Sequence, residues 1–147
     1  MTLQTVLDAL VTSEYDAGAV YEIIASRNEG DVASTSLVFA EQERQHAQRI
    51  KSLIEHRGDL NQQVSDEVGQ RLMIYLKESD SKIEAAAASR KQLFRHALKM
   101  EKDSIALYQA IAKLFELGSV GRRQFEDLVK EEQTHMYFVL KQLHDME

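Results

Sequence analysis

The chain has 147 residues, contains no cysteine and no proline, and carries a formal net charge of −6. The lack of cysteine excludes disulfides, thiolate zinc sites, Cys-ligated iron–sulfur clusters and rubredoxin-type centres within it. The negative charge argues against nucleic-acid binding, because phosphate contacts need clustered Lys and Arg. The length suits a single domain over residues 1–147. There is no signal-peptide pattern and no apolar run long enough to span a bilayer, so we expect a cytoplasmic protein without a membrane partner.

Four long amphipathic helices are predicted, since runs of Ala, Leu, Glu, Lys, Gln and Arg are never interrupted by proline. In chain order, their expected ranges are 3–28, 32–57, 81–117 and 120–147. Gly30 can end the first helix and Asp31 can cap the second. Ser79 and Asp80 are the expected caps of the third, and the break at Gly118-Ser119 precedes the fourth.

The stretch between Gly58 and Ser79 is too long for a hairpin turn, and we expect a short helix within it from about Glu67 to Lys77. The order of connections is thus a short loop, a long crossover and a short loop. This order predicts two antiparallel helical hairpins joined by one long connection, which is the connectivity of a ferritin-like four-helix bundle.

The first and third predicted helices share one pattern along a buried seam. Apolar residues are followed by a glutamate, a small residue, a tyrosine and an isoleucine at heptad-like spacing. The glutamate and tyrosine are Glu14 and Tyr21 in one helix, and Glu101 and Tyr108 in the other. The two tyrosines either donate hydrogen bonds to the carboxylates or are ordinary core residues.

The second and fourth predicted helices each carry Glu-x-x-His in an apolar stripe, as Glu43 with His46 and as Glu132 with His135. Residues three apart lie on one helix face, so a carboxylate and an imidazole can point at the same ion. One such motif is a weak signal. Two in the same register, opposite matched glutamates on the other helices, predict a metal site.

The candidate metal ligands are therefore Glu14, Glu43, His46, Glu101, Glu132 and His135. They would serve two metal ions, with one histidine each and some carboxylates bridging. Two divalent cations would neutralise four carboxylates, each of which costs on the order of several kcal/mol to bury unpaired. Without metal, we expect some glutamates to be protonated, with raised pKa values, or the pocket to admit water.

The choice of metal follows from the ligand types. Imidazole and carboxylate without sulfur suit iron, manganese or zinc. Carboxylates that can shift between binding modes favour a metal that changes oxidation state, so iron is expected first and manganese second.

Other polar residues on these helices are expected outside the site. His56, His96 and His144 lie off the seam or near helix ends and are predicted to be surface residues. Glu41 and Glu131 precede ligand positions by one or two residues, which turns them towards solvent.

The stretches SEYDAGAVYEIIA, FAEQERQHAQRI, MEKDSIALYQAIA and VKEEQTHMYFVL resemble the rubrerythrin family of ferritin-like proteins. This resemblance covers most of the chain apart from the crossover, and it implies that the six candidates bind two iron ions. It also implies peroxide reduction with electrons from a rubredoxin domain, which this chain lacks, so a separate electron-donor protein such as rubredoxin would be needed. Some rubrerythrins use a further glutamate one turn after the ligand on the third helix, where this chain has Ser104.

The leading functional hypothesis is a rubrerythrin-like di-iron oxidoreductase that oxidises Fe(II) with hydrogen peroxide or dioxygen, in oxidative-stress defence or iron handling. One alternative is a di-iron oxygenase acting on an organic substrate. Another is a non-enzymatic iron-storage or structural metal-binding bundle. The resemblance further implies a homodimer or a higher homo-oligomer.

Overall fold

The computed structural model describes residues 1–56, 60–80 and 88–146, which are helical apart from short connections. The helices are α1 (Leu3–Ser26), α2 (Gly30–Glu55), α3 (Asp66–Asp80), α5 (Arg90–Ala112) and α6 (Val120–Asp145). Among these residues there is no strand, only an isolated bridge between Thr2 and Gln63. No helix in the described ranges is both long and apolar enough to cross a membrane.

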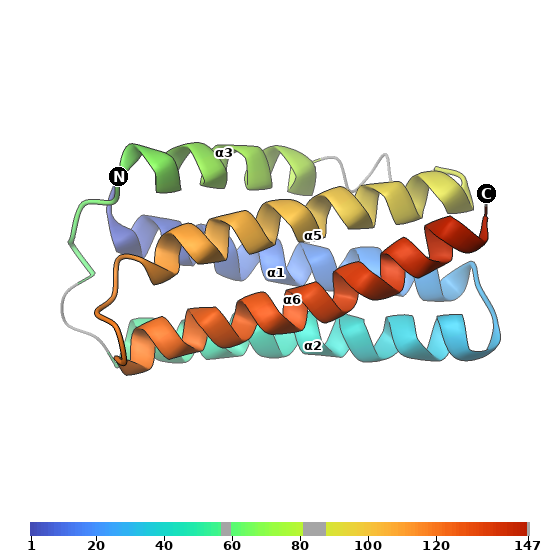
Figure 1. Cartoon of the computed structure of the whole chain (residues 1–147), viewed down its shortest axis with the longest axis horizontal. Helices are drawn as coiled ribbons and strands as arrows, with labels where there is room; N and C mark the ends of the chain where they lie inside the picture. The colour runs from blue at the N-terminus through green and yellow to red at the C-terminus, as the bar shows by residue number, and fades with distance from the viewer. Residues whose placement is uncertain (57–59, 81–87, 147) are drawn as a thin grey trace.

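The helices form two antiparallel hairpins, α1 with α2 and α5 with α6, as Figure 1 shows. The crossover that follows α2 contains α3, which runs back along the bundle beside α5 and α1. As a result α5 starts at the end of the bundle where α2 starts, and α6 returns antiparallel to α2. The prediction of an all-α, ferritin-like bundle with a helix in the crossover is confirmed.

The starts and ends of the helices differ from the sequence prediction mainly at the third long helix. The predicted start near Ser81 falls outside the described residues, but Ala88 and Ser89 are not helical, and α5 begins at Arg90. The reason is a capping box: the Ser89 hydroxyl accepts from the Gln92 amide, and the Gln92 side chain accepts from the Ser89 amide. Ser79 and Asp80, which were expected to cap this helix, instead end α3.

Smaller differences occur at the other ends. The third long helix stops at Ala112 rather than Leu117, because the chain turns there to bury Phe115 and then passes through Gly118 at φ 79°. Between α1 and α2, Glu29 occupies the N-cap position without a side-chain bond, and Asp31 lies in the first turn instead of capping it.

The core consists of two apolar clusters at opposite ends of the bundle. One contains Leu7 and Leu10 of α1 together with Ile50, and the other contains Tyr21 of α1 together with Phe94. Along α1, Glu14 lies between them and is fully buried. A polar layer therefore crosses the middle of the bundle.

Gly18, one turn after Glu14, allows α1 to approach α2 closely. A β-carbon at this position would lie 3.1 Å from the Ala40 carbonyl oxygen and 3.8 Å from the Glu43 β-carbon. The absence of a side chain on α1 thus helps to bring α2 and its polar residues into the layer.

Candidate metal centre

The polar layer is built from all four helices of the two hairpins. It contains the six residues singled out from the sequence, Glu14, Glu43, His46, Glu101, Glu132 and His135, and each is at most 1% exposed. The glutamate and histidine on α2, and those on α6, are three residues apart and so share the inward face of their helix.

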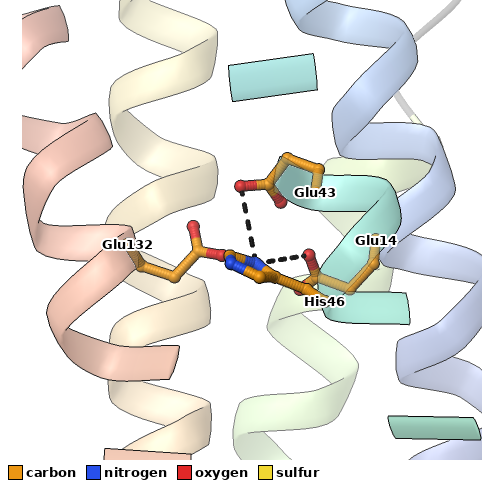
Figure 2. A group of neighbouring side chains, drawn as sticks. All are labelled: Glu14, Glu43, His46 and Glu132. Carbon is orange, nitrogen blue, oxygen red and sulfur yellow. Dashed lines mark ion pairs between the residues drawn. The ribbon is translucent and has the colours of Figure 1, made fainter. Parts of the chain in front are cut away.

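These residues form two overlapping groups. Glu14, Glu43, His46 and Glu132 each offer one ligand atom within 4.8 Å of the others, and so do Glu43, Glu101, Glu132 and His135. Figure 2 shows the first group, with the His46 ring between Glu132 on one side and Glu14 and Glu43 on the other. Because Glu43 and Glu132 belong to both groups, they are in position to bridge two ions.

Both imidazole rings turn their Nδ1 atom into the site. His46 Nδ1 lies 2.7 Å from Glu132 Oε1, 3.3 Å from Glu14 Oε2 and 3.8 Å from Glu43 Oε1. His135 Nδ1 lies 2.7 Å from Glu43 Oε1, 3.5 Å from Glu101 Oε1 and 3.6 Å from Glu132 Oε2. The rings are nearly parallel, at 15°, with centroids 6.0 Å apart.

The outer nitrogen of each ring faces a polar side chain on the opposite hairpin. His135 Nε2 lies 2.7 Å from Gln42 Oε1, and the ring stacks on Phe39 with a centroid separation of 4.1 Å. His46 Nε2 lies 3.6 Å from Glu131 Oε1. Such contacts set the orientation and tautomer of an imidazole that binds a metal through its other nitrogen.

The prediction that Glu131 points simply to solvent is therefore wrong. Its side chain is 38% exposed, and it lies at the edge of the site, between His46 and the Arg49 guanidinium, which donates to Glu131 Oε2 at 2.6 Å. The helix period turns Glu131 away from the core, but towards the α2 edge rather than into open water. The contact between Gln42 and His135 was not predicted for the same reason. It depends on which residue of α6 lies opposite Gln42, and the sequence of α2 alone does not show this.

Three phenols surround the carboxylates from the outside. Tyr21 donates to Glu101 Oε1 at 2.8 Å, and Tyr108 donates to Glu14 Oε1. Tyr75 of α3 also donates to Glu14 Oε1, at 3.2 Å. The sequence did not single out Tyr75; its spacing from Val68 and Leu72 marks the buried face of α3 but not the neighbour it meets.

The remaining histidines lie away from the centre. His56 and His144 are exposed, as predicted, whereas His96 is half-buried. Glu41 is exposed and pairs with Arg44. Ser104 is buried, and its hydroxyl donates to the Met100 carbonyl of its own helix.

The carboxylates of the layer do not ionise equally. Burial raises the pKa of Glu43 well above its ordinary value, and the charge of Glu132 adds to this shift. Burial and Glu132 also raise the pKa of Glu101. For Glu132, burial acts in the same direction, but its close contacts with Glu101 and with both histidines outweigh burial and lower the pKa. The sequence-based expectation of raised glutamate pKa values holds for Glu43 and Glu101.

The histidines are shifted towards the protonated form. Burial lowers the pKa of His135, but Glu101 and Glu132 outweigh it and raise the pKa to about 10. Burial also opposes protonation of His46, yet contacts with Glu131, Glu132 and Glu14 raise its pKa further above the ordinary value. In return, His46 is the main cause that lowers the pKa of Glu131 to about 2. Without metal, protons thus reduce the charge of the layer.

The donor set fits two divalent cations. Several buried atoms of the layer lack a hydrogen-bond partner among the residues that the structure describes. They include the Nδ1 atoms of His46 and His135, both oxygens of Glu132, and one oxygen each of Glu14, Glu43 and Glu101. Buried polar atoms normally have partners. Here they face one another, and nitrogen and oxygen donors without sulfur suit iron, manganese or zinc.

A helical bundle with a long crossover and this buried layer defines a ferritin-like protein with a candidate metal site. A family model for rubrerythrin matches residues 5–142, and the chain belongs to the rubrerythrin family. Comparisons with curated proteins and with solved structures give no match.

Proposed function

We propose that the chain holds two iron ions in the polar layer and oxidises Fe(II) with hydrogen peroxide or dioxygen. The observation that carries this proposal is the pair of four-residue groups that share Glu43 and Glu132. Glu14 with His46 would complete one metal position, and Glu101 with His135 the other. Membership of the rubrerythrin family supports iron as the metal, while manganese and zinc fit the same donors.

Two ferrous ions held there would supply one electron each to the O–O bond, so that hydrogen peroxide and two protons give two water molecules. The chain's own residues would position the ions and exclude bulk water. Glu43 and Glu132 would keep the two ions adjacent. The phenols of Tyr21 and Tyr108 would hold the outer carboxylates, and Gln42 would hold His135.

A repeated reaction needs electrons from elsewhere. Because the chain has no cysteine, it holds no rubredoxin-type centre of its own. We therefore propose a separate electron-donor protein as a partner. A homodimer or higher homo-oligomer, a cytoplasmic location and a role in oxidative-stress defence or iron handling remain predictions.

The rival oxygenase function would need an apolar channel beside the ions. Two surface pockets, of about 460 Å³ on α5 and α6 and about 630 Å³ around α3, include none of the six proposed ligands in their linings. They give the oxygenase no support. The storage alternative would require a closed shell of many subunits, which light scattering distinguishes from a dimer.

The test is reconstitution of the metal-free chain with two equivalents of Fe(II), followed by peroxide. We expect near-ultraviolet absorption typical of an oxo-bridged ferric pair, and faster oxidation by peroxide than by dioxygen if the protein is a peroxidase. The double variant Glu43→Ala, Glu132→Ala should lose this absorption while it keeps its helicity. Its matched control is Glu41→Ala, Glu126→Ala, which removes two exposed glutamates from the same helices. Unchanged absorption in the first variant contradicts the proposal.

A further inference from the structure

The two outer carboxylates of the centre are held by different numbers of phenols. Among the described residues, Glu101 accepts one hydrogen bond, from Tyr21, whereas Glu14 accepts two, from Tyr108 and Tyr75. Tyr21 and Tyr108 occupy equivalent positions in the sequence pattern that α1 and α5 share. In the part of the chain that the structure describes, Tyr75 has no equivalent, because it comes from α3 in the crossover; it is only 1% exposed.

The two oxygens of Glu14 have different neighbours: one contacts the phenols and the other faces His46. Both phenols donate to Oε1, while Oε2 has no hydrogen-bond partner within the described ranges and lies 3.3 Å from His46 Nδ1. On Glu101, Oε2 also lacks a hydrogen-bond partner among the described residues, but it is Oε1, the oxygen that accepts from Tyr21, that lies 3.5 Å from His135 Nδ1. On Glu14, the phenols and the histidine thus contact different oxygens, whereas on Glu101 the phenol and the histidine contact the same oxygen.

We propose that Tyr75 is a positioning residue that fixes Glu14 so that only Oε2 is offered to a metal ion, making the two metal positions unequal. The inference rests on the proposed function, since it concerns the same centre. Contacts that orient a metal ligand from outside typically change metal affinity by about 10–100-fold when they are removed. Loss of the Tyr75 hydroxyl should therefore weaken one position selectively, through Glu14.

The experiment is an anaerobic calorimetric titration of the full metal-free chain with Fe(II). Glu14→Gln and Glu101→Gln each identify the binding step that depends on that carboxylate. In Tyr75→Phe we expect the step that depends on Glu14 to weaken about tenfold, with the other step unchanged within about twofold. Tyr21→Phe is the matched control and should weaken the other step instead.

Two further measurements separate positioning from general packing. Combining Tyr75→Phe with Glu14→Gln should add no loss beyond Glu14→Gln alone, because Tyr75 acts through that carboxylate. Mössbauer spectra of the chain loaded with ⁵⁷Fe(II) should show a changed quadrupole splitting for one of the two ions only. If Tyr75→Phe folds poorly, Tyr108→Phe tests the same oxygen and should weaken the same step.

Equal weakening of both binding steps in Tyr75→Phe, or no change beyond about twofold in either step, overturns the inference about Tyr75 but leaves the proposed metal centre standing. Failure of the unsubstituted chain to bind two ions overturns the proposed metal centre, and the inference with it.

Discussion

The two halves of the centre use the same residue types on matched helices, yet their surroundings differ. Around Glu101 and His135, the partners that the described residues provide are a single phenol and the Gln42 amide at 2.7 Å. Around Glu14 and His46, they are two phenols and a partly exposed carboxylate at 3.6 Å. The comparison teaches that a sequence repeat can supply equivalent ligands while residues outside the repeated pattern make the positions unequal.

The largest expected effect is on the metal content, and it distinguishes the carboxylates that belong to both ligand groups from those that belong to one. Glu132→Ala removes a residue common to both groups and should reduce the metal content from two ions per chain to nearly none. Glu14→Ala removes a residue of one group and should leave about one ion. Elemental analysis after dialysis, normalised to protein concentration, gives the stoichiometry. Equal metal contents in the two variants would contradict the bridging role of Glu132.

A smaller effect is expected from the outer partners of the two rings. Gln42→Leu removes a 2.7 Å contact from a buried imidazole, and we expect the affinity of the His135 position to fall about tenfold. Glu131→Gln should have a weaker effect on the His46 position, because this contact is longer, partly exposed and shared with Arg49. Competition with a chelator measures both affinities. A larger loss in Glu131→Gln than in Gln42→Leu would reverse this ranking of the two halves.

The smallest effect is a pH dependence of the metal-free protein. The pKa of His135 is raised from 6.5 to about 10, so the folded chain binds more protons than the unfolded chain between these values. Its contribution to stability is present below about pH 6.5 and is lost as the pH rises through about 10. The melting temperature should therefore fall over this range, and the slope should be smaller in His135→Gln.

The same protons also couple pH to metal binding. Bound ions must displace them from the histidines and from Glu43 and Glu101, so metal affinity should rise with pH. A metal-free melting temperature that rises between pH 7 and 10 would contradict the pKa shift assigned to His135.

The sequence was sufficient for the main architecture and for the composition of the polar layer. Helical spacing placed Glu43 with His46, and Glu132 with His135, each pair on one helix face. The pattern shared by the first and third helices identified Glu14 and Glu101 as the glutamates opposite these pairs. These predictions required only local periodicity within each helix. The break between the third and fourth helices was also recognisable from Gly118.

The remainder depends on how helices face one another. In the sequence, Tyr75 is only one residue of an apolar stripe. Its hydrogen bond to Glu14 depends on the position of α3 beside α5 and α1. Glu131 is a contact of His46 only because α6 and α2 bring them together across the bundle. The start of α5 was predicted too early because the helix-favouring residues before Ser89 indicate a helix more strongly than Ser89 indicates a cap.

The division of the core into two apolar clusters has a consequence for folding cooperativity. Each cluster draws side chains from both hairpins, so each end of the bundle can hold the hairpins together independently of the middle. In the metal-free chain, the layer between them contains like-charged and protonated groups in place of apolar contacts. Amide hydrogens near Glu14 and Glu101 should then exchange with solvent through local openings, while those at both ends exchange only when the whole bundle unfolds. Bound metal would join the two ends into one cooperative unit.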